Sequence, residues 1–131
     1  MRTPSAAIAE VMSRYCWHVD RGEWPEWLAL FTDHAVWGMR GARPFEGREA
    51  LTKLAAGLAK QATAGPPTRH FTSNLLVEAN DDTASLRTYA MVIEVISGAT
   101  IMVGDYELEL VAQADGWRIA RMIFNPAAPS P

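Results

Sequence analysis

The segment Thr68-Arg69-His70-Phe71-Thr72-Ser73-Asn74 decides how the chain is interpreted, because it joins a proline break to a predicted strand. It follows Gly-Pro-Pro at 65–67 and leads into the apolar run 75–77, so it should open a β-strand. Side chains alternate along a strand, which places His70, Thr72 and Asn74 on one face. An imidazole there is a candidate general base, although the segment alone also suits a histidine that only makes a structural hydrogen bond.

Helices precede this segment and strands follow it, which predicts the α+β class. Apolar spacings of three and four predict helices over 4–19, from about 25, and over 48–62. A short strand is expected over 35–39, a loop over 41–47, and strands over 70–79, 83–97, 100–112 and 117–124, joined by hairpin turns. We therefore predict one domain over residues 1–125, built as an antiparallel meander packed on helices, and a disordered tail over 126–131.

Composition narrows the functional classes. The 131 residues are 49% apolar and 21% charged, with a formal net charge of −3, so a basic surface for nucleic acid is not expected. The single cysteine, Cys16, can form neither an intrachain disulfide nor a thiolate zinc site. No signal peptide and no membrane-spanning apolar run is evident. We expect a cytoplasmic, soluble protein without nucleic-acid or membrane partners.

The predicted strand over 83–97 is apolar on both faces, whereas an antiparallel sheet usually leaves one face to solvent. One face can cover a helix-lined cavity, and the other should then pack on a second subunit. The sequence therefore predicts a homo-oligomer, either a dimer or a trimer.

Asp20 stands where the first predicted helix ends. A carboxylate is unfavourable there, because the C-terminal end of the helix dipole is negative. Its position therefore calls for another reason, such as a partner elsewhere in the chain.

The order of motifs resembles the SnoaL-like branch of the nuclear-transport-factor-2-like superfamily over nearly the whole chain. The matching segments are YCWHVDRGEW at 15–24, LFTDHAVW at 30–37, FEGREA at 45–50, RHF at 69–71 and GWRI at 116–119. The resemblance implies a curved antiparallel sheet wrapped around the N-terminal helices, a cone-shaped, cystatin-like α+β barrel with a ligand cavity. Scytalone dehydratase, bile-acid dehydratases and hexachlorocyclohexane dehydrochlorinase use an Asp–His pair, which matches Asp20 and His70. Ketosteroid isomerases, polyketide cyclases and members without known chemistry share the fold, so family alone does not fix the reaction.

An elimination needs a base for an acidic C–H and an acid for the leaving group. A neutral histidine suits the first role, and a carboxylate on its other nitrogen fixes the tautomer. Asp20 and His70 are therefore candidate catalytic residues, with a purely structural or vestigial pair as the alternative. Tyr15, on the same helix as Asp20, is a candidate hydroxyl donor or an ordinary core residue.

Six further residues are candidates for substrate binding. Four would form an apolar, aromatic wall, one would be a cavity acid with a raised pKa, and one would hold an anionic or carbonyl oxygen. The alternatives are core packing for the first four and solvent exposure for the other two. The candidates for the wall are Trp24, Trp37, Met39 and Tyr89. Glu94 is the candidate cavity acid, and Arg121 is the candidate for holding the oxygen.

We therefore expect a cofactor-independent lyase of the dehydratase type, or an isomerase, acting on a hydrophobic, cyclic small molecule. The histidines and acids show no standard metal spacing, so neither metal nor cofactor is expected. The competing hypothesis is a non-catalytic ligand-binding or assembly module, since the sequence shows no second unmistakable catalytic acid.

Overall fold

In the computed structural model, which describes residues 3–127, helix α1 (Pro4–Arg21) begins and ends at clear signals. The Thr3 hydroxyl accepts a hydrogen bond from the Ala6 N–H at 3.2 Å, and Pro4 occupies the first turn. Gly22 ends the helix with φ 68°, a left-handed conformation that glycine adopts without steric cost. The helix predicted from apolar spacings of three and four is confirmed, and its buried residues are Ile8, Val11, Met12, Tyr15 and Cys16.

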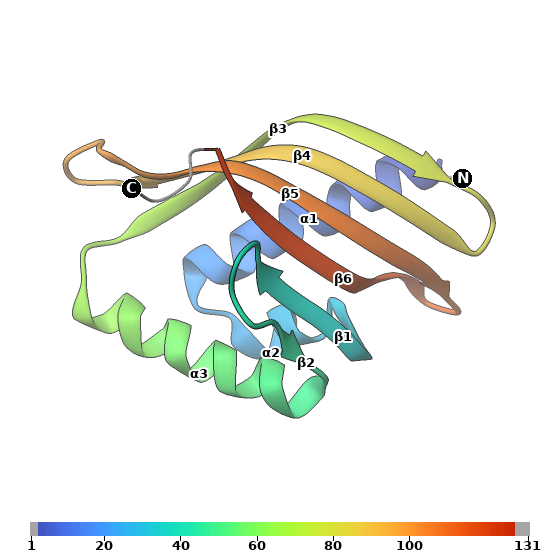
Figure 1. The fold of residues 1–131 in the computed structure, drawn as a ribbon, viewed down its shortest axis with the longest axis horizontal. Coiled ribbons are helices and arrows are strands. Elements are labelled where there is room, and N and C mark those ends of the chain that lie inside the picture. The colour runs from blue at the N-terminus through green and yellow to red at the C-terminus, as the bar shows by residue number, and fades with distance from the viewer. Residues whose placement is uncertain (1–2, 128–131) are drawn as a thin grey trace.

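Two more helices and six strands complete the fold of residues 3–127, and the α+β class is confirmed (Figure 1). The helices are α2 (Trp24–Leu28) and α3 (Arg48–Ala64). The strands are β1 (Phe31–Met39), β2 (Phe45–Glu46), β3 (Thr68–Ala79), β4 (Thr83–Glu94), β5 (Thr100–Gln113) and β6 (Gly116–Pro126).

The strands form one curved, unclosed sheet in the order β2-β1-β6-β5-β4-β3. All neighbours pair antiparallel except β1 and β6, the first and the last strand of the chain, which are parallel. Because β2 and β3 are edges, the sheet wraps its helices without closing into a barrel. α1 crosses beneath β3 to β5, and α2 and α3 lie beside the β1 end (Figure 1).

Several predicted boundaries need correction. Residues 41–47 are not all loop, because β2 pairs with β1 there. β4 ends at Glu94 rather than at 97. The expected tail starts too early, because Pro126 still belongs to β6 and the Ala127 N–H donates to the Val103 carbonyl at 2.9 Å. The rest of that expected tail, residues 128–131, lies outside the described residues.

The core fills the space between α1 and the sheet. Trp27 and Phe31 are fully buried with ring centroids 4.8 Å apart, and they join α2 to β1. Arg48 fastens α3 to this end, because its guanidinium donates to the carbonyls of Leu28 and Phe31 at 2.6 and 2.8 Å. Two backbone carbonyls at the α2–β1 junction therefore accept hydrogen bonds from a charged donor.

A bulge in β3 changes which side chains face the core. Asn74 has φ 58° and is an extra residue in β3, since Ser73 pairs with Tyr89 and Leu76 with Arg87. Asn74 is therefore exposed and does not share the face of His70, contrary to the simple alternation predicted from sequence. Such bulges increase local twist and help the sheet curve around the helices.

Candidate active site

Asp20 and His70 meet where the last turn of α1 passes the start of β3. The Nδ1 atom of His70 lies 2.7 Å from Oδ1 of Asp20, a short, charge-assisted contact. The backbone N–H of His70 also points at the carboxylate, at 3.2 and 3.1 Å from its two oxygens. The Asp20 side chain is only 9% exposed and the His70 side chain 17%. The unfavourable position of Asp20 at a helix C-terminus is thus offset by donors from β3.

This geometry constrains the chemistry of the imidazole. Because the carboxylate accepts from Nδ1–H, the neutral ring carries its lone pair on Nε2. Nε2 is therefore the nitrogen able to take a proton from a ligand. The carboxylate would then stabilise the imidazolium that forms, without itself being protonated.

A cavity of about 290 Å³ lies between the sheet and the helices, and His70 is part of its wall. Three of the predicted wall residues, Trp24, Trp37 and Met39, line it, as does the predicted donor Tyr15. The remaining lining is mostly apolar and includes Val19, Leu58, Val92, Met102 and Phe124. A space of this kind suits an apolar ligand held by few polar groups.

Two buried phenols line this cavity together with His70, Gln61 and Thr68. Tyr15 is 2% exposed, and its oxygen accepts a hydrogen bond from the indole N–H of Trp37 at 3.0 Å. Tyr106, on β5, packs edge-on against Tyr15 with ring centroids 5.9 Å apart. Burial raises the pKa of both phenols well above the ordinary value, although the Trp37 donor opposes this for Tyr15. Both therefore remain protonated donors at neutral pH.

Tyr106 was not selected from the sequence. The alternation of β5 carries the signal, because Gly104, Tyr106, Leu108 and Leu110 share its buried face. A tyrosine on the face that covers the helices lines any cavity between the two layers. Its chemical role depends on the partner Tyr15, which lies far away in sequence.

Three predicted substrate-binding residues lie elsewhere. Tyr89 is 60% exposed on the outer face of the sheet, because Thr88 and Ala90 take the inward positions of β4. Glu94 lies half-buried at the end of β4, two residues beyond Val92, and is not part of the cavity lining.

Arg121 is exposed, which corrects its expected inward orientation. Glu109 pairs with Arg121 and Leu110 with Ile119, so Ala120 is an extra residue in β6. After this bulge Met122, rather than Arg121, faces the core.

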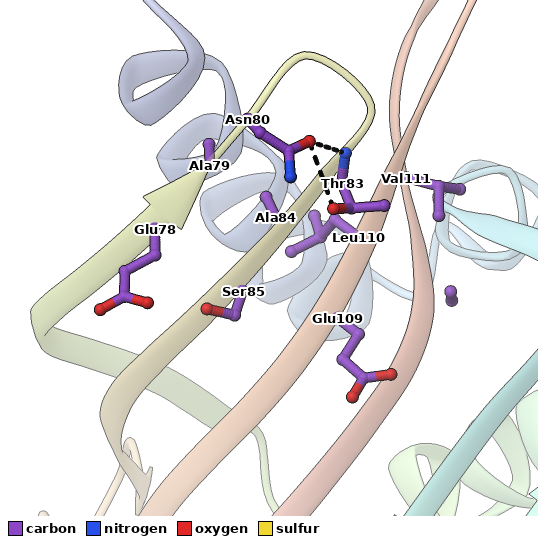
Figure 2. Close-up of a pocket in the computed structure, with 10 residues that line it drawn as sticks. Glu78, Ala79, Asn80, Thr83, Ala84, Ser85, Glu109, Leu110 and Val111 are labelled. Atoms are coloured by element: carbon purple, nitrogen blue, oxygen red, sulfur yellow. Dashed lines mark hydrogen bonds between the residues drawn. The ribbon is translucent and has the colours of Figure 1, made fainter.

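A second hollow at the far end of the sheet is a weaker candidate (Figure 2). It measures about 580 Å³ and opens widely to solvent beside the turn in which the Asn80 side chain accepts from the Thr83 N–H at 2.9 Å. Its ionisable groups are the carboxylates Glu78 and Glu109, without a histidine or phenol. This hollow therefore has no counterpart to the histidine and the tyrosine hydroxyls that line the 290 Å³ cavity.

Within residues 3–127, no group of three histidine, cysteine, aspartate or glutamate side chains is placed to hold a metal ion. No helix in that same stretch is long and apolar enough to cross a membrane.

The chain is similar to solved structures of other proteins with this fold. A structure of an NTF2-like protein with a cystatin-like fold from Novosphingobium aromaticivorans superposes with a TM-score of 0.85 at 23% identity, covering 96% of this chain and 83% of that one. A candidate scytalone dehydratase from the same organism superposes with a TM-score of 0.81 at 22% identity, covering 97% of this chain and 95% of that one. A protein of unknown function from Mycobacterium tuberculosis superposes with a TM-score of 0.82 at 25% identity, covering 95% of this chain and 72% of that one.

A comparison with curated proteins finds no match. The structural likenesses at 22% and 23% identity establish the fold, whereas chemistry depends on the residues of the cavity. The family model described as a SnoaL-like domain matches residues 3–123, which is nearly the whole described chain. The chain therefore belongs to the SnoaL-like domain family.

Proposed function

We propose that this protein is a cofactor-independent lyase of the dehydratase type, acting on a hydrophobic, cyclic small molecule that carries a carbonyl group. One observation carries the proposal: His70, whose Nδ1 lies 2.7 Å from the Asp20 carboxylate, forms part of the wall of a largely apolar cavity that two protonated phenols also line. A base beside proton donors in an apolar space matches the requirements of an elimination next to a carbonyl.

The proposed reaction proceeds in two steps. Nε2 of His70 removes a proton from the carbon next to the carbonyl, and the developing enolate oxygen accepts a hydrogen bond from Tyr15 or Tyr106. The enolate then re-forms the carbonyl as the hydroxyl group leaves the neighbouring carbon. That hydroxyl takes the proton from the imidazolium, so water departs and the base is regenerated. Returning the proton to another carbon instead would give an isomerisation with the same residues.

Replacing His70 by alanine is expected to reduce turnover by about 10²–10⁴-fold, which is the usual contribution of a positioned general base. The assay incubates the protein with a panel of cyclic β-hydroxy ketones and follows the conjugated enone by absorbance. His34→Ala, which changes an exposed histidine on β1, is the matched control and should keep full activity.

The substrate search starts from the protein itself, by mass spectrometry of small molecules that co-purify with it. A captured ring compound that the protein binds but never converts, with His70→Ala binding it equally well, would contradict the lyase assignment. That result would favour a binding module in its place.

We also propose that the protein works as a homo-oligomer through the outer face of its sheet. Met91 and Val103 are neighbours in register on β4 and β5, and both are exposed. Tyr89 lies on the same face. Exposed apolar side chains in adjacent register form a surface that a second copy can cover.

Sedimentation velocity at micromolar concentration is therefore expected to give at least twice the 14.4 kDa mass of one chain. Met91→Lys should shift the protein toward the monomer, because it buries a charge in the proposed interface. Ala56→Lys adds the same charge at an exposed position of α3 and should leave the mass unchanged. A folded wild-type monomer would contradict the proposal.

A further inference from the structure

A separate groove of about 540 Å³ follows the seam where α1 runs beside β3. Asp20 and His70 contribute to its lining as well as to the active site, but most of the groove belongs to neighbouring residues. Trp17 and Arg21 come from α1, and Arg69 and Phe71 come from β3. Trp17 and Phe71 are 59% and 50% exposed, so two aromatic rings in this groove remain in contact with solvent.

The groove carries an excess of positive charge. Among residues 3–127, neither Arg21 nor Arg69 pairs with a carboxylate. Arg21 stacks over the Trp17 ring at 4.6 Å from its centroid, and Arg69 donates to the carbonyl of Thr68 at 2.9 Å. The one carboxylate in the lining, Asp20, already accepts from His70. The groove therefore contains two guanidinium groups and a single carboxylate, which is already hydrogen-bonded to His70.

The positions of the two arginines follow from the Asp20–His70 contact. Arg21 follows Asp20 on α1, and Arg69 precedes His70 on β3. The contact that joins the two elements therefore also brings both guanidinium groups to the same groove. Stacking on Trp17 orders the Arg21 fork while its N–H groups remain at the rim, which is the arrangement that recognises planar anions.

We propose that this groove binds the anionic group of an organic ligand, a carboxylate or a phosphate ester, through Arg21 and Arg69. The planar apolar part of the ligand packs against Trp17 and Phe71. The arginine fork forms paired hydrogen bonds to carboxylate and phosphate oxygens, so one charge chemistry accounts for both ligand types. This site is independent of the proposed elimination, since none of the four residues takes a proton in it.

The test uses phenyl phosphate, benzoate and neutral phenol as probes, with binding measured by calorimetry and by amide chemical-shift changes in the full chain. We expect saturable binding of at least one anion, with the largest shifts at residues 17, 21 and 69–71. Arg21→Gln and Arg69→Gln should each weaken it about tenfold or more, because each removes a charged donor. Arg14→Gln is the matched control, because Arg14 lies on the same helix, pairs with Glu10 at 3.0 Å and is not part of the groove lining.

The outcomes separate this proposal from the proposed reaction. Binding of phenyl phosphate alone or benzoate alone identifies the ligand class, and raising the salt concentration should weaken either. Asp20→Asn should keep or strengthen anion binding, because it removes the negative charge of the groove while disabling the proposed base. Absence of saturable anion binding, equal affinity for phenol, or unchanged binding in both folded arginine variants would overturn the proposal. Thermal unfolding of each variant verifies that it folds.

Discussion

Replacing Asp20 by asparagine is expected to reduce kcat/KM of the proposed elimination by about 10²–10⁴-fold, within the range that correct acid–base catalysis contributes. Asparagine keeps the shape of the side chain and one oxygen for the backbone N–H of His70. It no longer offers a negative charge to the imidazolium, and its amide group can donate to the ring and favour the other tautomer. Nε2 would then carry the proton and could not act as a base.

Two measurements distinguish this role from a structural one. Nitrogen NMR of the imidazole should show the proton on Nδ1 in the neutral wild-type ring and a changed tautomer in Asp20→Asn. Asp33→Asn is the control, since Asp33 is exposed and its contact with Arg48 is 3.3 Å. Activity of Asp20→Asn within threefold of wild type, with an unchanged tautomer, would show that the carboxylate only holds α1 against β3.

The Asp20–His70 contact is the part of the site that the sequence predicts best. A carboxylate at the unfavourable end of a helix and a histidine after a proline break each stand out locally. The resemblance to the SnoaL-like branch paired the two positions across fifty residues, which periodicity alone could not do. Of the four residues proposed for an apolar, aromatic wall, Trp24, Trp37 and Met39 do line the cavity.

The errors come mainly from bulges. Arg121 was placed inward by counting along an ideal strand, and a single extra residue reverses such a count. The error at Tyr89 has another source, because β4 alternates regularly there and it was the aromatic side chain that suggested a place in the cavity wall. Ala120 gives no local sign that it is the extra residue in β6. Asn74 gives a partial sign, since asparagine tolerates positive φ better than most residues. Which residue is accommodated as a bulge is decided by the pairing of neighbouring strands, and this is tertiary information.

A glycine of β5 sets how closely the sheet can pack beside the cavity. Gly104 is buried and pairs with Pro126 of β6. A Cβ atom at this position would lie 2.2 Å from the carbonyl oxygen of Asn125 and 2.7 Å from the ring of Phe124. Phe124 packs on Tyr106 with ring centroids 5.3 Å apart, and both line the cavity. The absence of a side chain at Gly104 therefore lets Phe124 take its place in one wall of the cavity.

Gly104→Ala is accordingly expected to lower the free energy of unfolding by about 3 kcal/mol or more, at the upper end of overpacking costs, because a backbone oxygen cannot move aside as a flexible side chain can. Urea denaturation followed by tryptophan fluorescence measures this change. Gly57→Ala is the matched control, since Gly57 lies exposed in α3 with no atom within 4 Å of the added Cβ. The same substitution should there stabilise the protein by about 0.5–1 kcal/mol through helix propensity. Equal midpoints for the two variants would mean that β5 and β6 are farther apart than this packing requires, and that Phe124 is free to move relative to Tyr106.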